Sequence, residues 1–582
     1  MNTVDPITLA TTWHFIQRVC REMRETAERT ATNVLVTTLH DMAYGIWDKD
    51  GRVIAIPEGF PPRLIASTYV IKRVIEKFKG RIYPGDEFLT NYPGDGAVHL
   101  PDWVFVRPIF YKGELVFFTC MGTHVADSGG GHAGSHFLAY DSIAEALNIP
   151  LVKVIEKGVQ QDNVLELILA NNRLPDMMRR EIASLMGSTS VAERRMVELL
   201  DKYGKDTVNA CIDEMIVRTE KAVRAEIAKW PEGTYSAEVK TDDDGQTMGV
   251  PVSVRCKLTI KDGELTFDFS DTDPQVKGMI NAFYQQTMSN TLCTTFLFLG
   301  TELSAFHNEG SLKPVHVIAK PGTLVNCRLG ALVAGAPAVT GALTIEAVLS
   351  VLSQALPDKA VASYSRLIGP ILVGKDPRAE GIYVYTSFCA AAGSGAVAGY
   401  DGYQCSCDVG TLGVVGKSDA EEEMVRFPWD VLTYEYRTDA HGAGKWRGAP
   451  GVTWEAVNES GLDCECNGGP WSGFSTQAPG QQGGQSTPLN TAYVLRGKEK
   501  LWIKTPHIMT DMKAGDHLVT LSGGGAGVGR PEDRDIESVR MDVKNELVSV
   551  KMAREVYKVV INPDTLEVDQ KETQKLRAKR SV

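Results

Sequence analysis

Hydrophobic positions at the start of the chain recur with helical spacing. Asp5 and Pro6 come first, and they suit an N-cap residue and a first-turn proline. The pattern predicts a helix with one buried face, and residues 67–80 predict a second amphipathic helix. The apolar stripe of the first helix consists of Leu9, Trp13, Ile16, Val19, Cys20 and Met23.

Alternating apolar and polar positions predict strands in two further stretches. Residues 33–57 read as strands around a turn at 49–51, and residues 250–272 read as a β-hairpin that turns at Asp262 and Gly263. Between these stretches, residues 143–230 are predicted to be mainly helical. The N-terminal third therefore mixes helices with strands.

Glycines gather in the C-terminal half of the chain, in runs such as "DAHGAGKWRGAPG" and "LSGGGAGVGRPEDRD". Such runs bury too little side chain for an ordinary core layer, and they permit either disorder or close backbone packing, including extended polyproline II segments. Aromatic residues interspersed with the glycines favour packing. We therefore expect three domains. Residues 1–235 form a mixed α/β domain with the candidate site, 236–329 a β-rich domain, and 330–582 a glycine-rich packing and assembly domain.

Composition excludes some classes of protein. A formal charge of −12 over 582 residues argues against a nucleic-acid or anionic-membrane partner, because both need clustered lysine and arginine. Eleven scattered cysteines favour reduced thiols over a disulfide framework. We find no signal peptide and no window near eighteen apolar residues, so we expect a cytoplasmic protein.

Candidate chemistry begins in the turn-rich loop "NYPGDGAVHLPD", which contains His99 and Asp102. Two apolar runs follow around Lys112 and Gly113, and a two-residue hairpin there pairs residue 111 with 114 and residue 101 with 124. His124 would then lie within reach of His99 and Asp102. Lys-Gly is a weaker turn signal than Asn-Gly, so the alternative is a register that slips by one residue and reverses the faces. Two imidazoles and a carboxylate suit Zn, Mn or Fe and leave coordination positions open.

Neighbouring polar residues extend this candidate site. Asp127 and Asp95 are predicted to orient an imidazole or move a proton. His132 and His136 are weaker candidates, of which His132 is a further proton carrier. The alternative interpretation is that the histidines only cap turns in a polar loop.

Three other motifs are weak. Gly129, Gly131 and Gly134 match G-x-G-x-x-G without a clear βαβ context, and Thr411 stands where a P-loop needs its first glycine. The third weak motif is C-x-C, which predicts buried thiols rather than a zinc site. It occurs twice, as Cys405 with Cys407 and as Cys464 with Cys466.

The chain resembles the hydantoinase B type of family, which includes subunits of N-methylhydantoinase, 5-oxoprolinase, acetone carboxylase and acetophenone carboxylase. The resemblance runs nearly end to end and rests on motifs that include "HLPD", "THVADSGG", "LANNRLPD" and "YEYRTDAHGAGKWRGAPG". It implies an α+β multidomain fold of helices and barrel-like sheets, with a glycine-rich polyproline II bundle. It also implies that His99, Asp102 and His124 are metal ligands.

The same resemblance implies a hydantoinase A-type partner that binds ATP and Mg, within a hetero-oligomer that includes small subunits. Many hydrolase members carry a second histidine where this chain has Val125. We therefore expect a biotin-independent ketone carboxylase subunit similar to acetophenone carboxylase, which completes carboxyl transfer from bicarbonate to an aromatic ketone near a divalent metal. The alternatives are an ATP-dependent amidohydrolase of the N-methylhydantoinase or 5-oxoprolinase type and a non-catalytic scaffold.

Overall fold

The computed structural model describes residues 4–578, except 58, 305–306, 388–392, 405–407 and 504–507. The chain forms two compact units. The first contains Met1–Thr234, Cys256–Thr344 and Val414–Gly416, and the second contains Tyr235–Arg255, Ile345–Gly413 and Lys417–Val582. Helices and antiparallel sheets occur together, which confirms the mixed fold class. The three-domain division stays a prediction.

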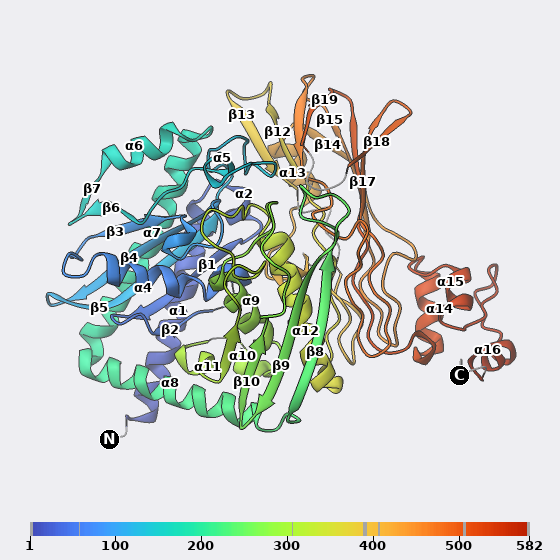
Figure 1. Ribbon diagram of the computed structural model, residues 1–582, viewed down its shortest axis with the longest axis horizontal. Helices are drawn as coiled ribbons and strands as arrows, with labels where there is room; N and C mark the ends of the chain where they lie inside the picture. Colours follow the sequence, from blue (N-terminus) through green and yellow to red (C-terminus); the bar gives the residue numbers. More distant parts are fainter. Residues whose placement is uncertain are drawn as a thin grey trace. The chain divides into compact units, whose positions relative to one another are not determined.

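A seven-stranded antiparallel sheet organises the first unit (Figure 1). Its strand order is β2-β1-β5-β4-β3-β6-β7, so the long hairpin β4–β5 lies at its centre. The strands are β1 (Met42–Asp48), β2 (Val53–Ala55), β3 (Glu87–Thr90), β4 (Asp102–Tyr111), β5 (Glu114–His124), β6 (Val152–Glu156) and β7 (Val159–Gln160).

Long helices pack on one face of this sheet (Figure 1). Helix α1 (Pro6–Thr30) begins at its N-cap Asp5 as predicted, and it packs on α7 (Pro175–Tyr203), which α8 (Lys205–Ile227) follows. Their apolar faces form one core with sheet residues such as Trp103 and Phe117. This core fixes the orientation of the β4–β5 hairpin.

Helix α4 (Ser67–Lys77) packs against β1, β4 and β5 on the opposite face. Trp47 of β1 pairs in register with Phe118 and donates its indole N–H to the Thr68 hydroxyl over 3.0 Å. The one-turn helix α3 (Pro61–Leu64) and the buried helix α9 (Tyr284–Phe296) contact each other, and α3 also contacts β1. The face with α4 is the one that carries the candidate site.

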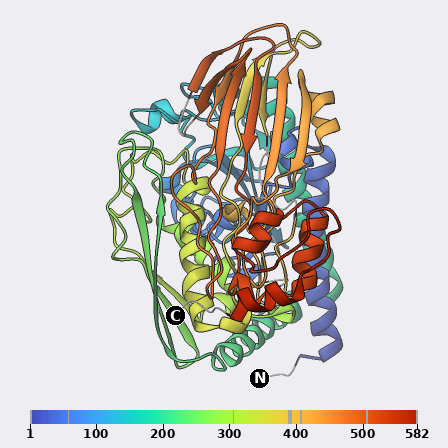
Figure 2. The same cartoon turned by 90° about the vertical axis from the view of Figure 1, so that its right-hand side faces the viewer.

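Two sheets dominate the second unit (Figure 2). Their orders are β13-β12-β16-β19 and β14-β15-β20-β17-β18, and none of the sheets in the described residues closes into a barrel. The strands are β12 (Ile371–Lys375), β13 (Ile382–Thr386), β14 (Trp429–Tyr436), β15 (Val452–Asn458), β16 (Cys464–Asn467), β17 (Thr491–Arg496), β18 (Glu499–Ile503), β19 (Ile508–Met512) and β20 (His517–Leu521).

Glycine-rich segments of the second unit pack backbone against backbone. The Gly442 amide donates to the Gly525 carbonyl over 2.7 Å, and the Gly527 amide donates to the Gln485 carbonyl over 2.9 Å. A Cβ atom added at Gly448 would lie 2.0 Å from the Gly525 carbonyl oxygen. Glycine is needed there because the neighbouring segment occupies the space of a side chain.

The described residues form further helices and strands, of which β8, β9, β10 and β11 make a sheet with the order β11-β10-β9-β8. They are α2 (Val34–Thr37), α5 (Ser142–Glu145), α6 (Asp162–Ala170), β8 (Gly233–Thr241), β9 (Val252–Lys261), β10 (Glu264–Asp268), α10 (Thr301–Ser304), α11 (Glu309–Leu312), β11 (Val315–Ile318), α12 (Ala342–Ala355), α13 (Ala420–Arg426), α14 (Ile536–Lys544), α15 (Val550–Glu555) and α16 (Gln570–Ala578). Short 3-10 turns are η1 (Pro93–Asp95), η3 (Pro357–Lys359), η4 (Val409–Thr411) and η5 (Pro531–Asp533), and η2 (Pro337–Gly341) is a π-helical turn.

The local patterns were right for hairpins and wrong at two helix–strand boundaries. Strands β9 and β10 turn at Asp262 and Gly263 as predicted, and both residues have positive φ. The stretch 143–230, however, contains β6 and β7, because edge pairing to β3 overrides its local helical preference. Residues 34–37, predicted as strand, form a helical turn that Asn33 caps.

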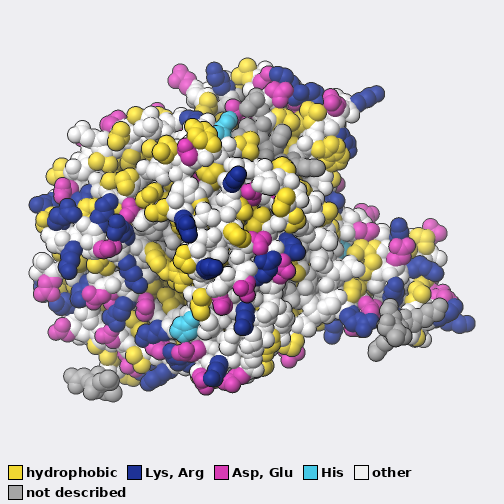
Figure 3. Space-filling model, viewed as in Figure 1, with side chains coloured by type: hydrophobic (Ala, Val, Ile, Leu, Met, Phe, Trp, Pro, Cys, Tyr) yellow, Lys and Arg dark blue, Asp and Glu magenta, His cyan; other side chains and the backbone are white. Residues whose placement is uncertain are grey.

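Surface and hydropathy agree with a globular chain. Basic and acidic side chains are interspersed over the face seen in Figure 3. Within the described residues, one helical stretch, Pro337–Ala355, is long and apolar enough to cross a membrane, and most of it is buried inside the protein. A buried core helix meets the same criterion.

Replacing Gly448 by alanine should destabilise the protein. The added methyl overlaps the Gly525 carbonyl, and such overpacking typically costs about 1–3 kcal/mol. Gly187 provides the matched control, because it lies inside α7 and open space surrounds the position that a Cβ atom would take, so Gly187→Ala should be neutral or stabilising. Thermal or denaturant unfolding of both variants measures this difference, and equal stability would contradict the packing role of Gly448.

Candidate metal centre

The β4–β5 hairpin positions the candidate ligands. Lys112 and Gly113 both have positive φ, as a two-residue type I′ turn requires, and Tyr111 pairs with Glu114 as predicted. A bulge between Ile109 and Phe110 then shifts the register by one residue. The predicted pairing of residues 101 and 124 is therefore wrong, and Asp102 itself lies opposite His124.

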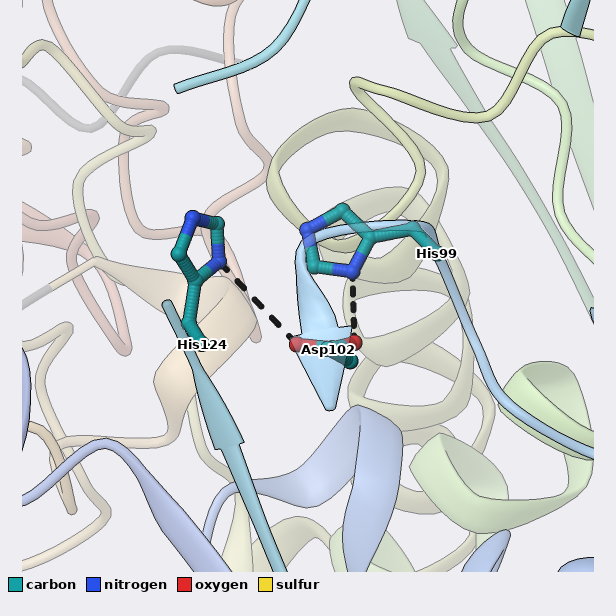
Figure 4. Close-up of side chains that lie close together, drawn as sticks. All are labelled: His99, Asp102 and His124. Carbon is teal, nitrogen blue, oxygen red and sulfur yellow. Dashed lines mark hydrogen bonds and ion pairs between the residues drawn. The ribbon is translucent and has the colours of Figure 1, made fainter. Parts of the chain in front are cut away.

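Three side chains converge at the open end of this hairpin (Figure 4). Asp102 begins β4, His124 ends β5, and His99 comes from the preceding loop. The His99 Nδ1 atom lies 2.5 Å from Asp102 Oδ2, and His124 Nδ1 lies 4.0 Å from Asp102 Oδ1. One ligand atom from each residue lies within 4.8 Å of the other two, so a single ion can contact all three.

A buried arginine supports the carboxylate from behind. Arg63 of α3 pairs with Asp102 through one guanidinium nitrogen and with Asp41 through another. Burial alone would raise the pKa of Asp102, but Arg63, together with His99 and His124, lowers it to about 2. Asp102 is therefore ionised at neutral pH and available as a ligand.

His124 is held in its neutral form. Burial, assisted by the nearby His99 and Arg63, lowers the pKa of His124 to about 3. About a quarter of its side chain is exposed, whereas Asp102 is fully buried. A neutral imidazole on the open side of the site is the form that binds a metal.

The sequence did not reveal the residues that brace these ligands. Asn33 donates its amide to the His124 carbonyl over 3.2 Å, and the Thr123 hydroxyl donates to the Asp41 carbonyl over 2.9 Å. Arg63 was also missed, although a lone arginine in the apolar run "GFPPRLIA" was a signal for a buried ion pair.

The donor set fits a divalent transition metal. Two imidazole nitrogens and one carboxylate oxygen leave coordination positions open, as in catalytic rather than structural sites. Within the described residues this is the one group of three or more potential ligands. The choice among Mn, Zn and Fe stays a prediction.

The two predicted proton carriers differ in their surroundings. Asp127 is buried, and its carboxylate accepts from the Arg173 amide and pairs with the Arg173 guanidinium. The rings of His132 and His136 lie 4.7 Å apart in the following loop. A catalytic role for Asp127 or His132 stays a prediction.

One of the two C-x-C pairs lies within the described residues, and both of its thiols are buried. Cys464 and Cys466 lie in β16, and burial raises the pKa of Cys464 to about 12. Cys405 and Cys407 lie outside the described residues. The described cysteines are free and buried, as expected for reduced thiols.

The chain is similar to known proteins over nearly its whole length. A family model described as hydantoinase B/oxoprolinase matches residues 5–531. Caprolactamase subunit beta of Pseudomonas jessenii is 30% identical over 572 residues, which cover 97% of this chain and 97% of that protein.

Two solved structures share the fold of the whole chain. An ATP-dependent caprolactamase from Pseudomonas jessenii gives a TM-score of 0.89 at 29% identity and covers 99% of this chain and 100% of that chain. A nucleotide-free acetone carboxylase gives a TM-score of 0.88 at 19% identity. The match covers 99% of this chain and 84% of that chain. The second likeness concerns the fold alone.

Asp102→Asn should abolish stoichiometric binding of a divalent ion, because the substitution removes the anionic ligand. Glu87→Gln is the matched control, since Glu87 is a buried carboxylate that pairs with Arg107 in the same sheet. Elemental analysis and Mn²⁺ titration of both variants measure this difference. Retention of one tightly bound ion by Asp102→Asn would contradict the assignment.

The stability of the metal-free chain should depend on His124 in acid. Its pKa falls from 6.5 to about 3 on folding, so the unfolded chain takes up this proton first as pH decreases. The free energy of unfolding should therefore fall between about pH 6.5 and 3. Denaturant unfolding of His124→Asn should show a shallower pH slope than the wild type, and identical slopes would contradict a neutral imidazole.

Proposed function

Because the chain belongs to the hydantoinase B/oxoprolinase family, we propose that it is the metal-bearing subunit of an ATP-dependent enzyme that opens a cyclic amide. The main observation in favour is the His99–Asp102–His124 centre in a chain that is 30% identical, nearly end to end, to a caprolactamase subunit. The substrate class is a lactam or a related cyclic amide.

The position of Val125 bears on the choice between hydrolysis and carboxylation. Its side chain belongs to the hydrophobic core together with Trp103 and Met121, on the face of the hairpin opposite to Asp102 and His124. Because neighbouring strand residues point to opposite faces, a histidine at this position would not add a ligand beside His124. The departure at Val125 therefore gives no reason to prefer carboxylation.

The residues of this chain create a site for a polar carbonyl group. When bound, a divalent ion would supply Lewis-acid polarisation of that carbonyl. His99, Asp102 and His124 would hold it, while Arg63 fixes the carboxylate orientation. The ionised carboxylate of Asp102 attracts a divalent cation, and the bound cation would attract an anionic phosphorylated substrate.

Proton transfer is assigned to His132 rather than Asp127. Both oxygens of Asp127 already bind Arg173, and this pair fixes the loop instead of leaving a mobile carboxylate. His132 lies in that loop beside His136. An imidazole can both accept and donate a proton through its ring nitrogens, which suits a proton carrier.

The ATP-dependent step is assigned to a partner subunit. The sequence lacks the first glycine of a P-loop at Thr411, whereas the solved caprolactamase is described as ATP-dependent. We propose a hydantoinase A-type partner that binds ATP and Mg and phosphorylates the substrate. Ketone carboxylation with bicarbonate is the second candidate, because the same fold occurs in acetone carboxylase.

A purified complex should hydrolyse ATP in response to cyclic amides and release the ring-opened amino acid. Asp102→Asn should lower turnover by about 100-fold or more, since loss of even supporting residues around a metal typically costs 10–100-fold. Lys229→Gln, a change of an exposed side chain, should leave turnover unchanged.

Labelled bicarbonate separates the alternatives in the same assay. Label incorporated into a ketone product would replace the hydrolase proposal with the carboxylase. A complex that keeps full activity with His99→Ala and without bound metal would indicate a scaffold subunit.

A further inference from the structure

Helix α9 is a buried helix with an unusually polar surface. All of its residues except Tyr284 and Met288 are buried, and they include several amide and hydroxyl side chains. Buried polar groups need hydrogen-bond partners, so their partners indicate what the helix holds in place. The partners of Gln285 and Ser289 lie in two segments of the candidate metal centre, whereas Gln286, Thr287 and Asn290 bind carbonyls of residues 325–341.

Gln285 binds the loop that carries His99. Its side-chain amide donates to the Ala97 carbonyl over 2.8 Å and to the Pro93 carbonyl over 3.2 Å. These two carbonyls lie on either side of Gly96, whose φ of 104° makes the turn. The amide therefore clamps the turn two residues before His99.

Ser289 binds the helical turn that carries Arg63. The Ile65 amide donates to the Ser289 hydroxyl over 3.0 Å, and the hydroxyl donates to the Pro61 carbonyl. In a regular helix the amide of residue 65 would donate directly to the carbonyl of residue 61. The hydroxyl of α9 is thus inserted into this hydrogen bond, and it sets the pitch of α3 around Arg63.

Gln285 and Ser289 are four residues apart, so they share one face of α9. We propose that this face is the template of the metal centre and that Gln285 and Ser289 are positioning residues, which set the distance between the His99 loop and the Arg63 turn. Asp102 lies between these two segments, because His99 contacts one carboxylate oxygen and Arg63 the other. The inference rests on the proposed function as a metal centre.

The template determines how well the ligand set is preorganised. Neither Gln285 nor Ser289 contacts His99, Asp102 or His124 through a hydrogen bond; each acts through backbone groups of the segment that it holds. Loosening either contact lets His99 or Arg63 move relative to Asp102. Metal affinity should then fall even though every ligand remains.

Titration of the full-length chain with Mn²⁺ and with Zn²⁺ tests this role. Gln285→Ala and Ser289→Ala should each weaken binding by about 10-fold, the lower end of what supporting residues around a metal provide. Thr294→Val is the control on the same helix, because the Thr294 hydroxyl donates only to the Asn290 carbonyl of α9 itself. This control should leave metal affinity unchanged, although it removes a buried hydrogen bond.

A double-mutant cycle distinguishes positioning from general loss of stability. Ser289→Ala should weaken metal binding less in an Arg63→Lys background than in the wild type. The reason is that the guanidinium group, which Ser289 positions against Asp102, is already absent from the Arg63→Lys variant. Additive effects, or variants that bind the ion as tightly as the wild type, would overturn the positioning role and leave the metal centre intact. A wild-type chain that binds neither ion would instead overturn the metal centre, and with it the template. If Arg63→Lys fails to fold, the comparison with Thr294→Val still decides the question.

Discussion

The first unit depends on one interaction, the pairing of the fully buried, ionised carboxylate of Asp102 with Arg63 and His99. A buried charge is tolerated only with close partners, and here Arg63 and His99 approach its two oxygens. Each partner comes from a different segment, so the sheet, the turn-rich loop and α3 must all be fixed to satisfy one group. A divalent ion would join an arrangement that already concentrates charge at this point.

Short-range chemistry made part of this site predictable. The turn at Lys112 and Gly113 follows from the need for positive φ at both positions, and it places His124 near Asp102. The bulge between Ile109 and Phe110 was not predicted, because extending the pairing from the turn assumed an unbroken register. The same holds for Arg63 and Asp41, which meet Asp102 only through tertiary contacts.

Fold class and family were more accessible than the reaction. Helical and alternating patterns were sufficient for α1, α4 and the hairpins, whereas β6 and β7 form because β3 offers an open edge. The glycine runs indicated close packing but not which segments meet. Solved structures with this fold include an ATP-dependent caprolactamase and an acetone carboxylase, so one fold occurs in proteins named for different reactions.

The hydroxyl of Ser289 inside α3 also affects how this part of the chain can assemble. A single turn of helix is too short to persist in isolation, since its nucleation is unfavourable. Its missing internal bond is supplied by a residue more than two hundred positions later in the chain. The three metal ligands should therefore reach their final positions late in folding, after α9 has packed against α3. A nascent chain that ends before α9 would lack an ordered metal-binding site.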